Sequence, residues 1–471
     1  MSQESRLVKN TAIYAVGNIS SKVLTYVMVI VYSHYISPDE LGYYDIVVTT
    51  VSMFLPIVMV ELHEGMYRYL VSSGKYRRTE VLATSFKVLS LVAIFSELVF
   101  FSISRFINIE LSLLIMFYSL CLILYCTIQM AVRGLSDNKL YATVGVINSL
   151  IILVCEVIGI VLLHYGIDAL LFSMGFAYLT SSIIFFIKKN KLKVCFRSRI
   201  NGSLLKELLK YSVPLIPTTI CWAVVSSCDR FIILFYLGPE YNGMFAMSAK
   251  FPTVITAVTS IFYMAWQESA IKEYHSPSRD SFFSKVFDKY AVLLFSSCFC
   301  CIPAMKFMAL NFLDVKYSAS WMFTGALFLA ACYMALSSFL GLGYQISKQT
   351  LKSTVNSMIA AVTNVIINLA FIKLVGLHAA STSTLVSYMT LFFIRVYDTK
   401  RYFTINYNWG KIVCLQIVSI LLIIFTFVVD NSIAIGCVTI SCIMTWLYLN
   451  KFIIEPIVKK MTKMVIGRLY G

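Results

Sequence analysis

Three basic residues, Lys22, Arg230 and Lys250, lie inside long apolar stretches of the sequence. A charge at the centre of a helix surrounded by lipid costs about 3 kcal/mol, so each of these side chains needs a partner or a water-filled cavity. Arg can grip phosphate oxygens through two parallel N–H groups, and Lys acts as a compact point charge. We therefore expect the three side chains to line a cavity that binds an anionic group such as a diphosphate. For Arg230 and Lys250 the alternative is a structural ion pair with Asp229.

Acidic residues in apolar stretches form a second set of candidates. Glu61, Glu64 and Arg68 are spaced three and four residues apart, which places them on one face of a continuous helix. They are predicted to form a gate that breaks and re-forms, or a carboxylate site for a coupling ion, and Asp229 is a further candidate for this role. The alternatives are a local salt-bridged face and, for Lys22, snorkelling or a structural pair with either glutamate.

The elements that carry these residues are predicted to be membrane-spanning helices. Of the 471 residues, 59% are hydrophobic and 13% charged, and the mean hydropathy is +0.81. Soluble domains have about 25% charged residues, so this composition excludes a soluble globular protein. We expect an all-α integral membrane protein with about 14 transmembrane helices. Their expected ranges are 11–36, 45–67, 82–104, 111–132, 142–164, 169–187, 212–237, 243–267, 290–310, 319–343, 353–374, 379–396, 412–429 and 432–450.

The charge distribution predicts the orientation of these spans. The chain has 39 Lys and Arg against 23 Asp and Glu. Most of the basic residues fall in the segments that face one side, and the opposite loops contribute Arg105 and Lys316. The positive-inside rule then places both termini in the cytoplasm. The excess of positive charge is explained by topology, so we expect no nucleic-acid partner. Most of the 13 cysteines lie in apolar runs and are expected to be core residues, with no metal site.

A weak internal repeat predicts two lobes. A shift of 201 residues sets Pro38 and Gly42 on Pro239 and Gly243, in the same predicted outer turn of each copy. Six spans is an even number, so the copies are expected to be parallel and related by a pseudo-twofold axis along the membrane normal. Lobes of this kind can open a cavity to either side in turn. The expected division is an N-lobe with spans 1–6 (1–190), a basic cytoplasmic linker (191–211), a C-lobe with spans 7–12 (212–401), and spans 13–14 with a cytoplasmic tail (402–471).

Several short motifs carry a family resemblance. They are Ser37-Pro-Asp-Glu-Leu-Gly42, Met66-Tyr-Arg-Tyr69, Tyr211-Ser-Val-Pro-Leu-Ile-Pro217, Asp229-Arg-Phe-Ile-Ile233, Leu237-Gly238, Gly243-Met-Phe245, Ala249-Lys250 and Val375-Gly-Leu-His-Ala-Ala380. In order and spacing they resemble the lipid-linked oligosaccharide flippases. These form the polysaccharide transporter family of the MOP superfamily, which also contains the MATE drug exporters. The sequence departs from that pattern at His378, where relatives often carry a small residue.

The resemblance implies a flippase of the cytoplasmic (inner) membrane. Its substrate would be an undecaprenyl-diphosphate-linked repeat unit destined for O-antigen (lipopolysaccharide), capsule or another exopolysaccharide. The lipid bilayer is the other expected partner, and the polysaccharide polymerase and chain-length machinery are candidates for further contacts. The expected cycle is alternating access, with no covalent chemistry, no enzymatic activity and no cofactor.

Two other functions compete with this interpretation. An ion-coupled, MATE-type small-molecule exporter would share the architecture, but several deep cations favour an anionic substrate. A membrane-embedded polysaccharide polymerase or ligase would need a long outward loop or domain to hold acid and base groups over a sugar, and the sequence offers none.

Overall fold

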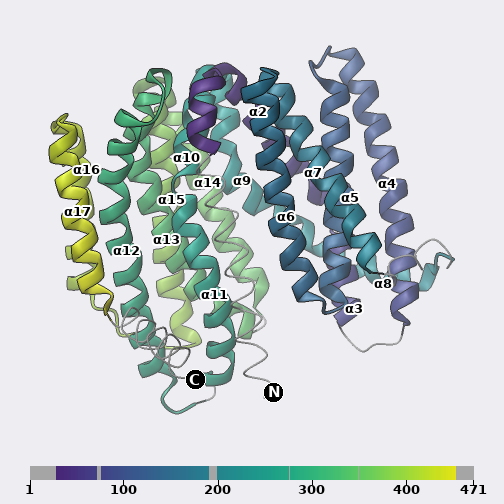
Figure 1. Cartoon of the computed structure of the whole chain (residues 1–471). Coiled ribbons are helices and arrows are strands. Elements are labelled where there is room, and N and C mark those ends of the chain that lie inside the picture. The colour runs from purple at the N-terminus through teal and green to yellow at the C-terminus, as the bar shows by residue number, and fades with distance from the viewer. Residues whose placement is uncertain (1–27, 72–75, 190–198, 275, 348, 452–471) are drawn as a thin grey trace, which may run out of the picture. The chain divides into compact units, whose positions relative to one another are not determined.

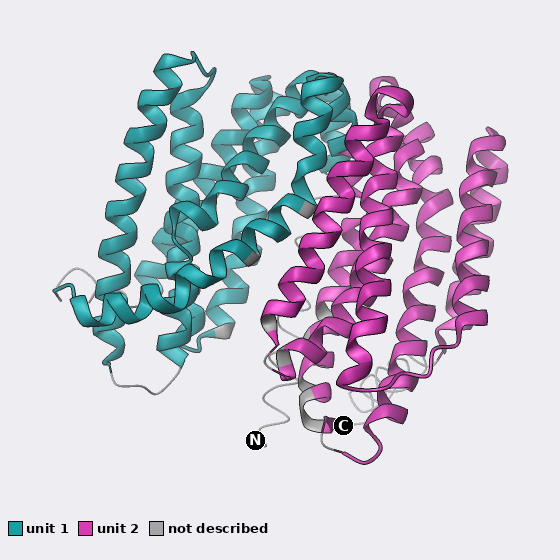
Figure 2. Ribbon diagram, turned by 180° about the vertical axis from the view of Figure 1, so that it is seen from behind, with its two compact units in different colours: residues 1–246 teal, residues 247–471 magenta. Residues whose placement is uncertain are grey.

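The computed structural model describes residues 28–71, 76–189, 199–274, 276–347 and 349–451 (Figure 1). Within these ranges the regular elements are helices, and no strand occurs among them. Residues 28–35 are helical and form the end of the first predicted span. Lys22 lies outside the described residues. The chain divides into two compact units, residues 1–246 (unit 1) and 247–471 (unit 2), which Figure 2 colours separately.

Unit 1 is built from helices that run the length of a span and from shorter helices beside them. They are α2 (Pro38–Val58), α3 (Leu62–Val71), α4 (Arg78–Phe106), α5 (Ser112–Gly134), α6 (Asn138–Glu156) with a π-helical continuation (Val157–Leu162), α7 (Gly166–Lys188), α8 (Gly202–Ser212), a 3₁₀ turn (Val213–Leu215) and α9 (Ile216–Tyr236). Helix α10 (Pro239–Lys250) runs across the boundary between the units.

Unit 2 continues with longer helices. They are α11 (Thr253–Glu273), α12 (Arg279–Asn311), a 3₁₀ turn (Val315–Ser320), α13 (Trp321–Ile346), α14 (Thr350–Val375), α15 (Leu377–Asp398), a 3₁₀ turn (Thr399–Arg401), α16 (Trp409–Val428) and α17 (Ser432–Leu449).

The expected all-α membrane fold is confirmed. Among the described residues, 11 helices are long and apolar enough to cross a membrane, or 12 if the bent pair Gly202–Val224 and Ser226–Tyr236 forms one span. Two of the 14 predicted spans are missing even when the bent pair is counted as one span. The first lies mostly outside the described residues, and 243–267 is divided between α10 and α11 at Phe251 and Pro252. The total of 14 therefore stays a prediction.

The surfaces of these helices fit a lipid environment. Inside unit 1, fully buried side chains tie α3, α5 and α8 together, among them Met66, Ile128 and Leu208. Large apolar side chains elsewhere stay exposed, such as Phe106 at 90% and Ile433 at 78%. In water such a surface would drive association, whereas hydrocarbon chains solvate it.

The compact units do not coincide with the predicted lobes. The boundary falls after Ala246, so the predicted end of the N-lobe at residue 190 lies inside unit 1. The reason is that α8 and α9 pack against helices of the first copy: α8 contacts α3, and α9 contacts α2. The repeat-based division into 1–190, 191–211, 212–401 and 402–471 stays a prediction.

Candidate functional site

The start of α2 is fixed by the residues of its first turn. The Ser37 hydroxyl accepts from the Glu40 amide, and the Glu40 carboxylate accepts from the Ser37 amide and hydroxyl, which forms a capping box. Pro38 fits the first helical position because it has no N–H to leave unsatisfied. This turn is the predicted outer end of the helix.

The same turn packs against its repeat-related copy at the start of α10. A Cβ atom at Gly42 would overlap the backbone carbonyl of Pro239, and a Cβ at Gly243 would overlap the carbonyl of Pro38. The contact is thus reciprocal, and each glycine lets the carbonyl of the other turn approach. The Asn242 side-chain amide also donates to the Gly42 carbonyl at 2.8 Å. The repeat detected in the sequence therefore corresponds to a physical contact between its two copies.

Arg230 lies beside this contact. Its Nε donates to the Asp45 carboxylate at 2.6 Å, and its Nη1 donates to the Ser226 carbonyl at 2.9 Å. Asp45 follows Gly42 by one turn of α2. The two charged side chains are 18% and 20% exposed, so neither is sealed from its surroundings. The pair bridges α9 and α2 directly below the glycine contact.

The other predicted cations are placed as follows. Lys250 is the last residue of α10, is half-buried, and belongs to unit 2. Asp229, next to Arg230, is buried at 3% exposure. The sequence offered an ion pair with Asp229 as the alternative to a cavity role for Arg230; the ion pair in the structure joins Arg230 to Asp45, which is 185 residues away in the chain.

Glu61 lies in a break between α2 and α3, whereas Glu64 and Arg68 lie together on α3. Val60 and Glu61 have φ values of 50° and 52°, so they form a left-handed turn between α2 and α3. The shared helical face that the spacing predicts needs a continuous helix and is interrupted here. Glu61 contacts the His63 imidazole at 3.8 Å, and the Arg68 guanidinium lies 4.3 Å from the centre of the Tyr211 ring.

Two buried cations in unit 2 were missed at the sequence level. Lys306 of α12 is 1% exposed and donates to the Thr426 and Val429 carbonyls and to Asp430 at 2.6, 2.9 and 2.8 Å. Arg395 of α15 is 2% exposed. A charged residue within an apolar run was the signal that could have found them, because Lys306 and Arg395 fall within the predicted spans 290–310 and 379–396.

Arg395 joins three helices. It donates from Nη1 to the Ser337 carbonyl on α13 at 2.8 Å, and from Nη2 to the hydroxyls of Ser353 and Ser357 on α14 at 3.3 and 3.4 Å. Gly341 makes room for it, since a Cβ there would lie 2.6 Å from Nη1. This packing fits a structural role.

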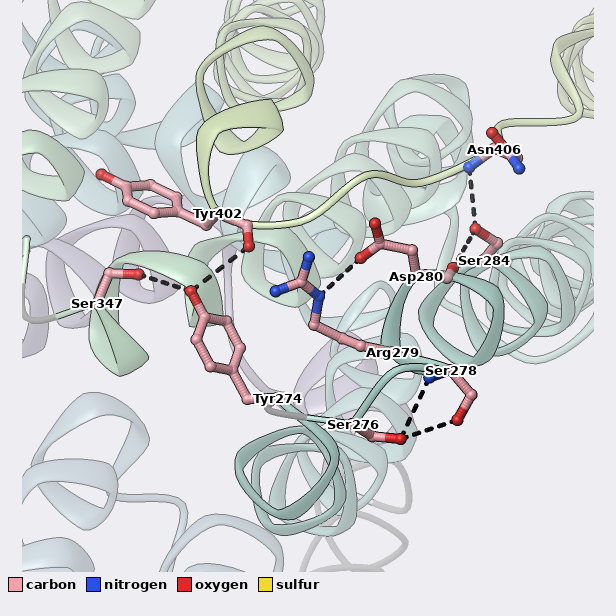
Figure 3. Close-up of polar contacts among 9 residues, drawn as sticks. All are labelled: Tyr274, Ser276, Ser278, Arg279, Asp280, Ser284, Ser347, Tyr402 and Asn406. Carbon is pink, nitrogen blue, oxygen red and sulfur yellow. Dashed lines mark hydrogen bonds and ion pairs between the residues drawn. The ribbon is translucent and has the colours of Figure 1, made fainter.

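A polar cluster ties together helix ends of unit 2 on the predicted cytoplasmic side (Figure 3). The Tyr274 hydroxyl lies 3.2 Å from the Ser347 hydroxyl and donates to the Tyr402 carbonyl at 3.5 Å. Beside it, Arg279 donates to Asp280 at 2.7 Å. The Asn406 amide donates to the Ser284 hydroxyl at 2.9 Å, and this bond links the segment before α16 to α12. These contacts join the ends of several helices, which fits a structural connection between them. No group of three or more His, Cys, Asp or Glu able to hold a metal occurs in the described part of the chain.

Comparison with known proteins identifies the family. A family model described as polysaccharide biosynthesis protein matches residues 7–267, more than half of the chain. The chain belongs to this family. The match covers both turns of the glycine contact and the Asp45–Arg230 pair. No curated protein matches the sequence.

Solved structures give the fold. The lipid II flippase MurJ in an inward closed conformation matches with a TM-score of 0.73 and 12% identity, over 95% of this chain and 100% of that one. A MATE multidrug transporter of the MOP superfamily in an inward-facing conformation matches with a TM-score of 0.63 and 12% identity, over 85% and 99%. A MATE-family multidrug transporter in an outward-facing conformation matches with a TM-score of 0.59 and 12% identity, over 88% of this chain and 99% of that one. The family member thus has the MurJ and MATE fold, as the sequence motifs predicted.

Proposed function

We propose that the protein moves an undecaprenyl-diphosphate-linked oligosaccharide from the cytoplasmic to the outer leaflet by alternating access. The product would feed O-antigen, capsule or exopolysaccharide synthesis, and no covalent step is involved. The family and the flippase fold support a lipid-linked substrate. The proposal places the protein in the cytoplasmic membrane with both termini inside.

The observation that carries the proposal is the pairing of Arg230. Its guanidinium has five N–H groups, and in the described part of the chain Nε and Nη1 have protein acceptors. The pair is partly exposed, so a diphosphate can replace Asp45 as the anionic partner with two parallel bonds. Exchange of partners would release α9 from α2 and loosen the glycine contact above them. Substrate binding and opening of the predicted outer end are coupled by this exchange.

The other candidates keep supporting roles in this proposal. Lys22 and Lys250 are further cationic contacts for the diphosphate. Glu61, Glu64, Arg68 and Asp229 are candidates for the gate or for ion coupling. The half-buried position of Lys250 at the end of α10, two residues before Pro252, is compatible with such a contact.

The test is complementation of a strain that lacks the gene. The wild type should restore surface polysaccharide, and the deletion strain should accumulate complete lipid-linked repeat units on the cytoplasmic face. Arg230→Gln should restore less than a tenth of the export at normal protein abundance, and Arg230→Lys should restore an intermediate level. The matched control is Arg105→Gln, which removes an exposed charge at the C-terminal end of α4. This variant should behave as wild type.

Two outcomes would overturn the proposal. Full export by Arg230→Gln would remove the guanidinium from the mechanism. Normal glycan and normal lipid-linked pools in the deletion strain would favour the MATE-type exporter, whose fold the chain shares.

A further inference from the structure

A groove of about 550 Å³ opens between α2, α4 and α5 in unit 1. Its walls are mostly apolar, with Phe54 from α2 and Phe95 from α4 among the large side chains. One acidic residue, Glu97 of α4, lies in this lining. By the rise of an α-helix, it lies about 14 Å from the end of α4 at Phe106, well within the span.

The Glu97 carboxyl group is poorly satisfied. Its Oε1 accepts from the Ser119 hydroxyl of α5 at 2.6 Å. Its Oε2 is buried and has no hydrogen-bond partner in the described part of the chain. Ser119 has a single proton, which the Met116 carbonyl at 3.1 Å also attracts.

The other polar residues of the groove are occupied elsewhere. The Thr50 hydroxyl donates to the Ile46 carbonyl at 2.6 Å, and the Ser96 hydroxyl donates to the Ala93 carbonyl at 2.8 Å. Among the lining residues, neither α2 nor α5 contributes a charged or titratable side chain that faces Glu97. The carboxyl group therefore meets one hydroxyl and otherwise hydrocarbon.

Such surroundings favour the neutral carboxylic acid over the carboxylate. An ionised carboxylate has about four acceptor positions to satisfy, and this groove offers one donor. Water would stabilise the charge if the helices moved apart. Because Ser119 links Glu97 to α5, movement between α4 and α5 would change both the donor and the access of water.

We propose that Glu97 is a reversible proton-binding site, and that its loading and release are coupled to opening of this groove during transport. The second half of the proposal rests on the proposed function. The first half concerns the protein alone and can be tested without any substrate.

The first experiment uses N,N′-dicyclohexylcarbodiimide, an apolar reagent that adds to protonated carboxyl groups and forms a stable N-acylurea. The full-length protein in liposomes is labelled at a series of pH values, and the adducts are located by peptide mass spectrometry. At about pH 7, where an exposed glutamate is ionised, Glu97 should carry the adduct. Glu80 and Glu110, which lie near the two ends of α4, are the internal controls and should stay unlabelled.

The pH series provides the decisive readout. Labelling of Glu97 should fall as the pH rises. Ser119→Ala removes the donor to the carboxylate, so labelling should persist to higher pH in that variant, and Glu97→Gln should abolish the adduct. Absence of the adduct, or a yield that does not change between about pH 6 and pH 10, would overturn the site.

The second experiment tests coupling. Flipping of the lipid-linked oligosaccharide is measured in liposomes with and without a pH gradient. Wild-type transport should respond to the gradient, and Glu97→Gln should lose at least most of that response. A response that is unchanged in Glu97→Gln would overturn coupling. If the wild type moved no lipid-linked oligosaccharide, the proposed function would fail, while the labelling result would still decide the proton site.

Discussion

Units 1 and 2 hold basic side chains within their helices in two different ways. In unit 2, Lys306 and Arg395 are 1% and 2% exposed, and each donates to three acceptors, mostly backbone carbonyls or hydroxyls. In unit 1, Arg230 stays 18% exposed and holds a single carboxylate and one carbonyl. From this difference we infer that a charge within a span indicates function when the side chain is exposed enough to exchange its partners. A cation that is itself buried and bound mostly by backbone carbonyls and hydroxyls indicates a structural role instead.

The largest expected effect on stability is at Arg395. Arg395→Leu would leave the Ser337 carbonyl and two hydroxyls without their donor inside the protein. Hydrogen bonds to charged groups each contribute about 2 kcal/mol, and relaxation recovers part of the loss, so we expect a net cost of about 3 kcal/mol. The measurement is the thermal loss of monodisperse protein in detergent.

Gly341→Ala provides an independent control for the same contact, because its Cβ would press on the Arg395 guanidinium. Gly202→Ala is the matched substitution, since no atom lies within 4 Å of its Cβ. A melting temperature of Gly341→Ala equal to that of Gly202→Ala would contradict the tight packing described for Arg395.

The second largest effect is expected at Lys306. Lys306→Met removes the donor that satisfies the Thr426 and Val429 carbonyls at the end of α16, and we expect a cost of about 2 kcal/mol. Lys411→Met makes the same chemical change at an ion pair with Asp288 that is 41% and 36% exposed. There the cost should stay below about 1 kcal/mol. Equal shifts of the two melting temperatures would remove the distinction between buried and exposed lysines.

Arg230 should show the opposite balance between stability and function. Arg230→Gln should lower stability by at most about 1 kcal/mol, because its ion pair is partly exposed. Export should nevertheless fall to less than a tenth of the wild-type level in the complementation assay. A melting shift as large as that of Arg395→Leu would place Arg230 among the structural cations and break the comparison.

The smallest effect is expected outside the spans, at Asp137. Partial burial raises the pKa of this carboxyl group, but hydrogen bonds from Lys189 and from the Leu140 amide outweigh burial and hold the pKa below its usual value. A depressed folded-state pKa stabilises the protein above the unfolded value of about 3.9, and this contribution is lost as the pH falls through the folded value.

The size of this contribution should be below about 1 kcal/mol, because both partners are partly exposed. Asp137→Asn should therefore melt slightly earlier than wild type at neutral pH, and the difference should vanish in acid. The check is a melting series from about pH 7 down to pH 3. A difference that grows in acid would contradict the sign of the pKa shift.

The sequence predicted helices well and side-chain partners poorly. Hydropathy locates helices because a span needs about 20 apolar residues, whatever it packs against. The depth of Arg230 follows in the same way from its distance to the helix end. The pairing of Arg230 with Asp45 cannot be predicted in this way, because the two residues meet through the packing of α9 on α2. The single helical face expected for Glu61, Glu64 and Arg68 was wrong for Glu61, which lies in the left-handed turn before α3. The spacing of the three residues does not reveal this turn.

The reciprocal glycine contact has a consequence for how the two copies of the predicted repeat can change during evolution. After duplication, two copies ordinarily drift apart, and each accepts substitutions without reference to the other. Gly42 and Gly243 each lie against the backbone of the opposite copy. A side chain introduced at either glycine would therefore collide with the backbone of the other copy. The two turns that contain Gly42 and Gly243 therefore cannot accept substitutions independently of each other.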